Sequence, residues 1–290
     1  MGERFLFQQV SRMIVKMSKE LPIVPIPSEA RPIDKKFLKL KYRRSLFEPP
    51  FVCRVQGMIG AGKTAFLWSM LNDFYAKYFD EVVIYSGTKD SAEHWEKIPQ
   101  KAVCVLHEWN PAAFHDYLQK LEADQEARKA KGKRPLNVCI AFDDMIANGI
   151  DKHHGSKRSP LEHLILVCRH LNVSIIVLTQ DSKTGMTPAM RNNCMFHVVY
   201  RVQKNDLAKI AEEHSNNLST AEFERMYHGI MEKGPHEWLM VDYKAPPEKR
   251  FRHGFTKVIK PQHIIKDAET ESDPTPGSDG LSALSESRAK

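Results

Sequence analysis

The stretch that decides the fold is GMIGAGKT, residues 57–64. It matches the pattern G-x-x-x-x-G-K-[ST] in full, with an apolar segment before it and a helical pattern after it. Its glycines let successive backbone N–H groups face a phosphate, and the N-terminus of the following helix adds a positive dipole end. Lys63 is placed to bridge the β- and γ-phosphates, and the Thr64 hydroxyl is placed to bind Mg²⁺. The stretch therefore predicts a site for a nucleoside triphosphate with Mg²⁺.

The segments around this loop show two kinds of pattern. Near-continuous apolar runs predict buried strands at 51–56, 81–86, 102–107, 136–142, 173–179 and 194–201. Capping residues and apolar spacing predict helices at 63–78, 110–130, 159–170 and 219–229. Two late segments, 236–243 and 255–260, predict a small antiparallel extension. The predicted fold is α/β: a P-loop NTPase of the additional-strand ATPase type, whose mostly parallel central sheet has helices on both faces.

Two adjacent acids follow the strand predicted at 136–142, in the sequence VCIAFDDM. The end of this strand should lie beside the glycine loop, so that Asp143 holds Mg²⁺ and Asp144 orients and polarises the attacking water. The alternative interpretation is a solvated acid pair that caps the following turn. Small-molecule kinases with a phosphate loop usually lack the second acid, because they must avoid activating water. The pair therefore favours hydrolysis of the nucleotide.

A polar residue ends the next predicted strand, in the sequence VSIIVLTQ. Its amide, that of Gln180, can contact the γ-phosphate or the attacking water and report hydrolysis to the rest of the domain. The alternative is an ordinary glutamine at the end of a strand. The order of phosphate loop, paired acids and polar strand end is typical of additional-strand ATPases.

Three segments resemble the genome-packaging ATPases of large DNA viruses and virophages, including the poxvirus type: VQGMIGAGKTAFLWSML, VCIAFDDMI and CRHLNVSIIVLTQDSKTGMTPAMRNNC. This group belongs to the FtsK–HerA superfamily of ring-forming DNA translocases. The resemblance covers residues 51–201 and is weakest at 87–135. It implies ATP as substrate, Mg²⁺ at Thr64 and Asp143, a water-activating acid at Asp144 and a sensor at Gln180. The implied nucleotide contacts are Gly57, Gly60, Ala61, Gly62, Lys63 and Thr64.

Rings of this kind are completed by an arginine from the neighbouring subunit, which stabilises charge on the transferred phosphoryl group. Arg191 is the preferred candidate, because it follows the sensor strand in a predicted loop that can reach an interface. Arg169 is the alternative, although it lies late in a predicted helix and can simply favour the helix C-terminus. The chain departs from related translocases by having Asp-Asp where they have Asp-Glu. The resemblance thus implies a homo-oligomeric ring whose active sites lie between subunits.

The charge distribution suits a polyanionic partner. The net charge is +7 even though the last segment, 267–290, is acidic. A basic body favours binding to nucleic acid through counterion release, and no base-reading motif is present, so we expect backbone contacts with double-stranded DNA of any sequence. The candidate contact segments are GIDKHHGSKRSP at 149–160, EKRFRHGFTK at 248–257 and KKFLKLKYRR at 35–44. The second of them interleaves basic residues with Phe251 and Phe255, as surfaces that stack on bases do. Each of them is equally consistent with a solvated basic face.

Composition also predicts the organisation of the chain. Residues 1–50 form a basic, proline-containing arm, residues 51–266 the ATPase domain, and residues 267–290 a disordered acidic and serine-rich tail. No apolar run is long enough for a membrane span, and the five widely spaced cysteines are expected to be free thiols. The expected location is intracellular, in the viral factory of the host cytoplasm, and in the virion.

The predicted function is that of a motor that hydrolyses ATP to move double-stranded DNA into a viral capsid. Capsid and portal-vertex proteins are then further expected partners. The alternatives are a P-loop kinase or other phosphotransferase acting on a small acceptor, another FtsK–HerA type DNA translocase outside packaging, and a regulatory nucleotide-binding module with little turnover. A kinase would need a lid rich in arginines, and the sequence shows none.

Overall fold

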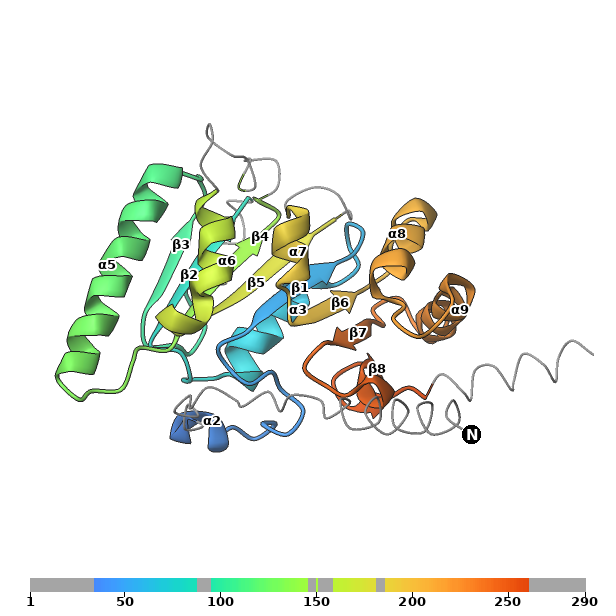
Figure 1. The fold of residues 1–290 in the computed structure, drawn as a ribbon, viewed down its shortest axis with the longest axis horizontal. Coiled ribbons are helices and arrows are strands. Elements are labelled where there is room, and N and C mark those ends of the chain that lie inside the picture. Colours follow the sequence, from blue (N-terminus) through green and yellow to red (C-terminus); the bar gives the residue numbers. More distant parts are fainter. Residues whose placement is uncertain (1–33, 88–94, 146–149, 151–158, 181–185, 261–290) are drawn as a thin grey trace, which may run out of the picture. The chain divides into compact units, whose positions relative to one another are not determined.

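The computed structural model describes residues 34–87, 95–145, 150, 159–180 and 186–260. The chain divides into two units between Asp34 and Lys35, and the fold below is that of the second unit. Its described residues form one nine-stranded sheet in the order β3-β2-β4-β5-β1-β6-β7-β8-β9 (Figure 1). The parallel strands are β1 Val52–Gln56, β2 Glu81–Ser86, β3 Val103–Leu106, β4 Val138–Asp143, β5 Val173–Thr179 and β6 Phe196–Val199. The antiparallel ones are β7 Leu239–Asp242, β8 Phe251–His253 and β9 Lys257–Val258. The predicted mostly parallel sheet with an antiparallel extension is therefore confirmed.

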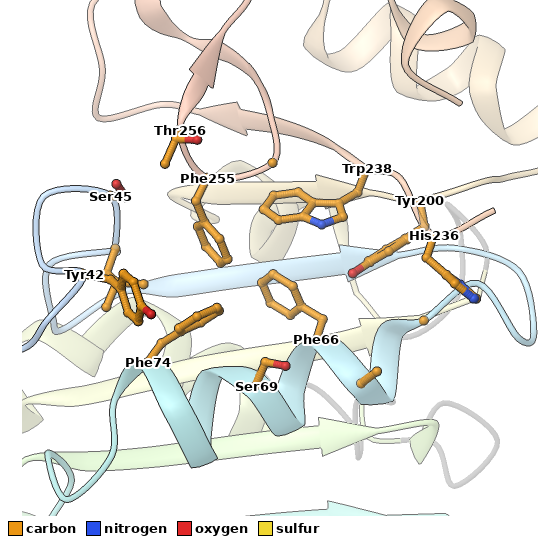
Figure 2. Close-up of a pocket in the computed structure, with 14 residues that line it drawn as sticks. Tyr42, Ser45, Phe66, Ser69, Phe74, Tyr200, His236, Trp238, Phe255 and Thr256 are labelled. Atoms are coloured by element: carbon orange, nitrogen blue, oxygen red, sulfur yellow. The ribbon is translucent and has the colours of Figure 1, made fainter. Parts of the chain in front are cut away.

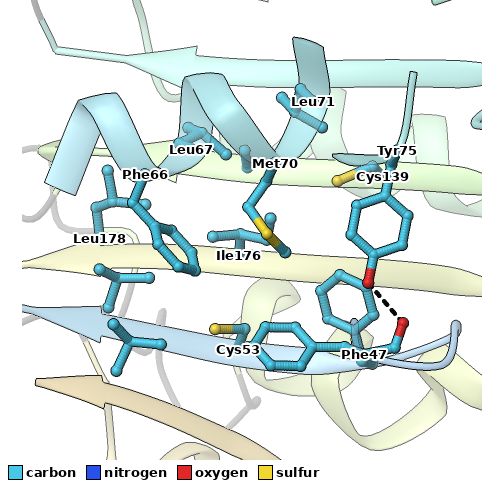
Figure 3. Close-up of a cluster of buried hydrophobic side chains, with 14 of the residues drawn as sticks. Phe47, Cys53, Phe66, Leu67, Met70, Leu71, Tyr75, Cys139, Ile176 and Leu178 are labelled. Carbon is cyan, nitrogen blue, oxygen red and sulfur yellow. Dashed lines mark hydrogen bonds between the residues drawn. The ribbon is translucent and has the colours of Figure 1, made fainter. Parts of the chain in front are cut away.

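The central strands are apolar on both faces because helices cover both. Alternate residues of each strand belong to different core clusters: Ile176 and Leu178 of β5 pack in one, Ile175 and Val177 in the other. The first cluster contains α3 Lys63–Ser69 and the π-helical turn Met70–Phe74 that follows it (Figure 3). The second contains α5 Pro111–Ala130 and α6 Pro160–Leu171. The predicted coverage of both faces is confirmed.

Side-chain caps start the helices where the sequence predicts them. The Asn110 carboxamide oxygen accepts hydrogen bonds from the N–H groups of Ala112 and Ala113, and α5 begins at Pro111. Ser159 caps α6 by accepting from the Glu162 N–H. Ser219 and Glu222 form a complete capping box at the start of α9 Thr220–Met231. These caps satisfy N–H groups that have no partner within the helix.

Two predicted helices differ from the structure in their ends, and one helix was not predicted. The helix predicted at 63–78 ends as an α-helix at Ser69 and continues only as the π-helical turn to Phe74. The helix predicted to stop at Gly229 runs on to Met231. The helix α8 Lys204–His214 was not predicted, because its N-cap position, Gln203, makes no side-chain cap. The short elements α2 Lys35–Leu38, α7 Pro188–Asn192 and the 3₁₀ turn Pro247–Lys249 complete the described helices.

Residues 35–50, which the sequence assigns to the arm, pack within the second unit. The Phe47 ring stacks on Phe196 with a centroid separation of 3.9 Å, and the Phe47 carbonyl accepts a hydrogen bond of 2.5 Å from the Tyr75 hydroxyl (Figure 3). The Phe37 ring is buried as well. The segments 1–33 and 267–290, for which an arm and a tail were predicted, lie outside the described residues.

The structure also corrects one candidate DNA-contact segment. Phe251, expected to offer a stacking surface in EKRFRHGFTK, is buried in β8. Phe255, the second such ring, packs on Phe66, Phe74 and Trp238. Both rings are therefore part of the core and its edge. Nearly all of the loop 149–160 lies outside the described residues.

The predicted free thiols agree with the structure. Cys53, Cys139, Cys168 and Cys194 are buried free thiols, and Cys104 is free and exposed. Among the described helices there is none whose length and apolar content would suit a membrane crossing.

Candidate nucleotide-binding site

The phosphate loop is fixed between two strands at its first two residues. The Gly57 N–H donates to the Thr179 carbonyl of β5 at 3.1 Å, and the Met58 N–H donates to the Arg201 carbonyl, just beyond β6, at 2.8 Å. A Cβ atom on Gly57 would lie 2.7 Å from the Cβ of Tyr200, which leaves room only for glycine. Gly60 and Gly62 have φ angles of 76° and 110°, values that L side chains rarely adopt. Each glycine of the motif thus has a conformational or a packing reason.

Lys63 and Thr64 begin α3 directly after this loop. The Lys63 ammonium donates to the carbonyls of Gly57 at 2.8 Å and Met58 at 3.1 Å, so it folds back over the loop. Burial lowers the pKa of this ammonium, and the charges of Asp144 and Asp143 raise it in part. A bound triphosphate offers Lys63 charged oxygens, which are stronger acceptors than the two carbonyls.

The two acids lie at the end of β4. Asp143 is its last residue, and both of its carboxylate oxygens lie 3.3 Å from the donating Thr64 hydroxyl. Burial first, and then the charge of Asp144, raise the pKa of Asp143 to about 6, although Thr64 and Lys63 act against this. Removal of a carboxylate from water destabilises its charged form unless a cation is nearby. Asp143 is therefore a buried acid whose charge is incompletely balanced by the protein.

Asp144 occupies an unusual backbone conformation. Its φ angle is 52°, in the left-handed region that non-glycine residues seldom adopt. Its carbonyl lies so close to Gly87, after β2, that a Cβ on that glycine would approach it to 2.8 Å. The Gln180 amide nitrogen donates to the Asp144 carboxylate at 3.2 Å. The structure thus holds Asp144 away from the regular strand path and next to the end of β5.

The residues present fit a nucleotide with bound Mg²⁺. The donors that meet here are a threonine hydroxyl and one carboxylate beside a phosphate loop, and Mg²⁺ is usually held by one or two carboxylates together with substrate phosphates. In the described ranges, no group of three His, Cys, Asp or Glu side chains forms a separate metal site. The structure thus brings together Lys63, Thr64, Asp143, Asp144 and Gln180 as expected, and their catalytic roles stay predictions.

Arg191 does not lie in a loop as predicted. It lies in α7, where its guanidinium pairs with the Glu213 carboxylate of α8 at 2.9 Å and donates to the Met186 carbonyl at 3.0 Å. The helix forms because Thr187 caps it and Pro188 occupies its first position. Arg169 is exposed in the last turn of α6. Of the two candidates, Arg191 contacts residues of its own chain, whereas the Arg169 side chain is exposed.

Two residues beside the loop were missed from the sequence. His236 places Nδ1 3.2 Å from the Ala61 carbonyl, and the Tyr200 ring lies 3.5 Å from the position of a Cβ on Gly62. No motif marks either residue. The only available signal was their position near the ends of the strands predicted at 194–201 and 236–243.

Comparison with known proteins identifies the family of this chain. The family model described as "Poxvirus A32 protein" matches residues 38–233. Among solved structures, the genome-packaging NTPase B204 of Sulfolobus turreted icosahedral virus 2, in complex with AMP, is similar at 13% identity, covers 73% of this chain and 100% of its own, and gives a TM-score of 0.49. EssC (ATPases 2 and 3) of Geobacillus thermodenitrificans is similar at 12% identity, covers 77% of this chain and 43% of its own, and gives a TM-score of 0.47. No curated protein matches. The chain belongs to the poxvirus A32 protein family, and the predicted resemblance to viral packaging ATPases is thereby confirmed.

Proposed function

We propose that this packaging-type ATPase is a motor that uses ATP hydrolysis to move double-stranded DNA into a viral capsid. One observation carries the proposal. This chain of the poxvirus A32 protein family brings five side chains together at the carboxyl ends of β1, β4 and β5. They are the phosphate-loop lysine Lys63, the hydrogen-bonded pair Thr64 and Asp143, and the second acid Asp144 with its hydrogen-bond donor Gln180. Ligands of open α/β sheets bind at this end of the strands.

Each side chain has a role that follows from its contacts. Lys63 leaves its two loop carbonyls for the phosphates, and Thr64 and Asp143 hold Mg²⁺. Bound Mg²⁺ supplies neutralisation of the phosphate charge. Asp144 does not bind Mg²⁺ in this proposal. It accepts a hydrogen bond from the attacking water. Gln180, bonded to Asp144, senses whether that water and the γ-phosphate are present.

The active sites lie between subunits of a homo-oligomeric ring in this proposal. Arg191 can serve a neighbouring site only after leaving Glu213, whereas Arg169 is already exposed. Mixing two inactive variants distinguishes the arginines. Subunits with Lys63→Ala supply an intact arginine, and subunits with Arg191→Ala supply an intact phosphate site. Recovery of turnover on mixing identifies Arg191 as acting in trans, and recovery only with Arg169→Ala identifies the alternative.

The proposed DNA contacts are to the phosphate backbone. The segment 35–44 supports this role best among the described candidates, because Tyr42 is exposed beside Lys41, whose ammonium lies 5.1 Å from the ring centroid. Capsid and portal-vertex proteins are the remaining proposed partners. The proposed location is the viral factory of the host cytoplasm, and the virion.

The test is ATP turnover with and without duplex DNA, with the oligomeric mass measured in parallel. We expect stimulation by DNA, loss of ATP binding in Lys63→Ala, and loss of turnover with retained binding in Asp144→Asn. Asp124→Asn, an exposed carboxylate of α5, is the matched control and keeps full turnover. Full turnover in Asp144→Asn would reject the mechanism. Phosphate transfer to a small acceptor without DNA stimulation would favour the phosphotransferase instead.

A further inference from the structure

A cavity of about 710 Å³ opens along α3 beside the phosphate loop (Figure 2). One wall is α3 itself, which contributes Ala65, Phe66 and Ser69, and Gly62 of the loop lies at one end. The volume is that of a typical small-molecule site, which ranges from about 300 to 1,000 Å³. The catalytic roles proposed above do not use this cavity.

The opposite wall comes from the antiparallel extension. Trp238, directly before β7, and Phe255, in the turn between β8 and β9, line the cavity together with Phe66 (Figure 2). The Phe66 ring stacks on Phe255 at 5.7 Å between centroids and meets Trp238 edge-on at 5.5 Å. Both Trp238 and Phe255 remain partly exposed. The extension therefore builds an open aromatic wall over the helix that starts at the phosphate site.

The cavity and the phosphate loop share a boundary. His236 lines the cavity and places Nδ1 3.2 Å from the Ala61 carbonyl of the loop. Tyr200 also lines it and lies against Gly57 and Gly62. A ligand held here by its phosphates can thus continue into the cavity without leaving the surface of the protein.

Two groups of side chains lie on either side of the phosphate loop, and each can be weighed as the place for the rest of a nucleotide. Toward β4 and β5 it meets Asp143, Asp144 and Gln180, which are charged or polar groups suited to the γ-phosphate and water. Toward β6 and β7 it meets Tyr200, His236 and Trp238, which suit a flat aromatic group. A purine base is such a group, and its stacking on aromatic side chains stabilises binding.

We propose that this cavity binds the base and ribose of the nucleotide, with the base stacked against His236 and Trp238. This inference rests on the proposed function, since it concerns the same ATP molecule. The side-chain hydroxyls in the lining are those of Tyr42, Ser45, Ser69, Tyr200 and Thr256. A hydroxyl can both donate and accept, so it does not separate adenine from guanine by itself. We therefore expect ATP and GTP to bind within about tenfold of each other, an energy difference of about 1.4 kcal/mol.

The experiment compares a ligand that has a base with one that has none. Binding of ATP, GTP and inorganic tripolyphosphate to the full chain is measured by calorimetry in Mg²⁺ buffer. Trp238→Ala and His236→Ala should each weaken ATP and GTP by about 5- to 100-fold, and should leave tripolyphosphate unchanged. Trp238→Phe, which keeps an aromatic face, should restore most of the affinity.

Controls separate the base site from the fold and from the phosphate site. His228→Ala, an exposed histidine of α9, is the matched control for His236→Ala and keeps the affinity of the native chain. His236 is exposed, so its loss does not open the core. Unchanged ATP affinity in both cavity variants, with Lys63→Ala inactive in binding, would overturn the base site alone. Equal weakening of tripolyphosphate would overturn it too, because the wall would then only support the loop. No binding of ATP or tripolyphosphate by the native chain would reject the proposed function as well.

Discussion

A buried aspartate lies at each end of the β2–β4 strand pair, and the fold treats the two carboxylates in opposite ways. Asp80 precedes β2 at the amino end, and Asp143 ends β4 at the carboxyl end. Their exposed fractions are almost equal, 5% and 4%. The pKa of Asp80 is lowered to about 2, and that of Asp143 is raised to about 6. Burial alone therefore does not decide the behaviour of these acids.

The difference lies in their partners. Burial acts to raise the pKa of Asp80, but the Arg134 guanidinium, at 2.6 and 2.7 Å, and the Asn137 N–H, at 3.0 Å, more than compensate. Asp143 has the Thr64 hydroxyl and a like charge beside it. At the amino end of the sheet, the charge of Asp80 is thus balanced by partners within the chain. The carboxyl end leaves negative charge for which a bound cation is the natural complement.

The largest expected effect follows from removing the unbalanced charge. Asp143→Asn should lower ATP turnover by at least about 100-fold, because it removes the carboxylate that we propose as a ligand of Mg²⁺. The same change should raise the free energy of unfolding of the ligand-free protein at pH 7, by up to about 3 kcal/mol from two pKa units. Turnover assays and urea denaturation measure the two effects. A variant that is both inactive and less stable would contradict the comparison.

The matched substitution at the amino end of the strand pair, Asp80→Asn, should have the opposite effect on stability and should leave turnover unchanged. Asp80→Asn should lower the free energy of unfolding by about 1–2 kcal/mol, a value reduced because Arg134 is 45% exposed and its charge is partly screened. Turnover per folded molecule should stay that of the native chain. Denaturation with a parallel active-site titration checks this, and lost turnover at full folding would show that Asp80 also supports the site.

A pH series should separate the two acids further. The cost of charging Asp143 is absent below pH 3.8 and grows as the pH rises through about 6, so the stability gained by Asp143→Asn should widen from pH 4 to pH 7. The contribution of Asp80 is complete above pH 3.8 and is lost as the pH falls toward 2. The effect of Asp80→Asn should therefore be constant between pH 4 and pH 7. Urea midpoints of the three proteins across this range provide the test, and parallel curves would refute it.

The smallest expected effect concerns Arg191. Glu213→Gln removes a partly exposed ion pair and should cost less than about 1 kcal/mol in unfolding free energy. If Arg191 serves a neighbouring site, its release should keep or raise DNA-stimulated turnover, while Arg191→Ala should remove it. Equal losses in both variants would instead make the ion pair within the subunit the important feature.

The sequence predicted the parallel half of the sheet and the phosphate end of the site because their signals are local. The glycine loop, the acids after an apolar strand and the caps at Asn110 and Ser219 each depend on neighbouring residues only. The aromatic wall could not be predicted, since Tyr200, Trp238 and Phe255 meet only through antiparallel pairing of β6, β7 and β8. The loop expected around Arg191 was a helix, because Thr187 and Pro188 form a start signal that was overlooked.

Two backbone hydrogen bonds connect the phosphate loop to the strands on either side of it. Gly57 is tied to Thr179, which directly precedes Gln180, and Met58 is tied to Arg201, which directly follows Tyr200. Any displacement of this loop would therefore be transmitted through these hydrogen bonds to both neighbouring strand ends. The strand end that carries Gln180 and the strand end that carries Tyr200 are thus connected through one loop, and in the proposed mechanism loss of the γ-phosphate would change the contacts to the rest of the nucleotide. In the proposed mechanism, product release would therefore depend on how these two hydrogen bonds attach the loop to the sheet.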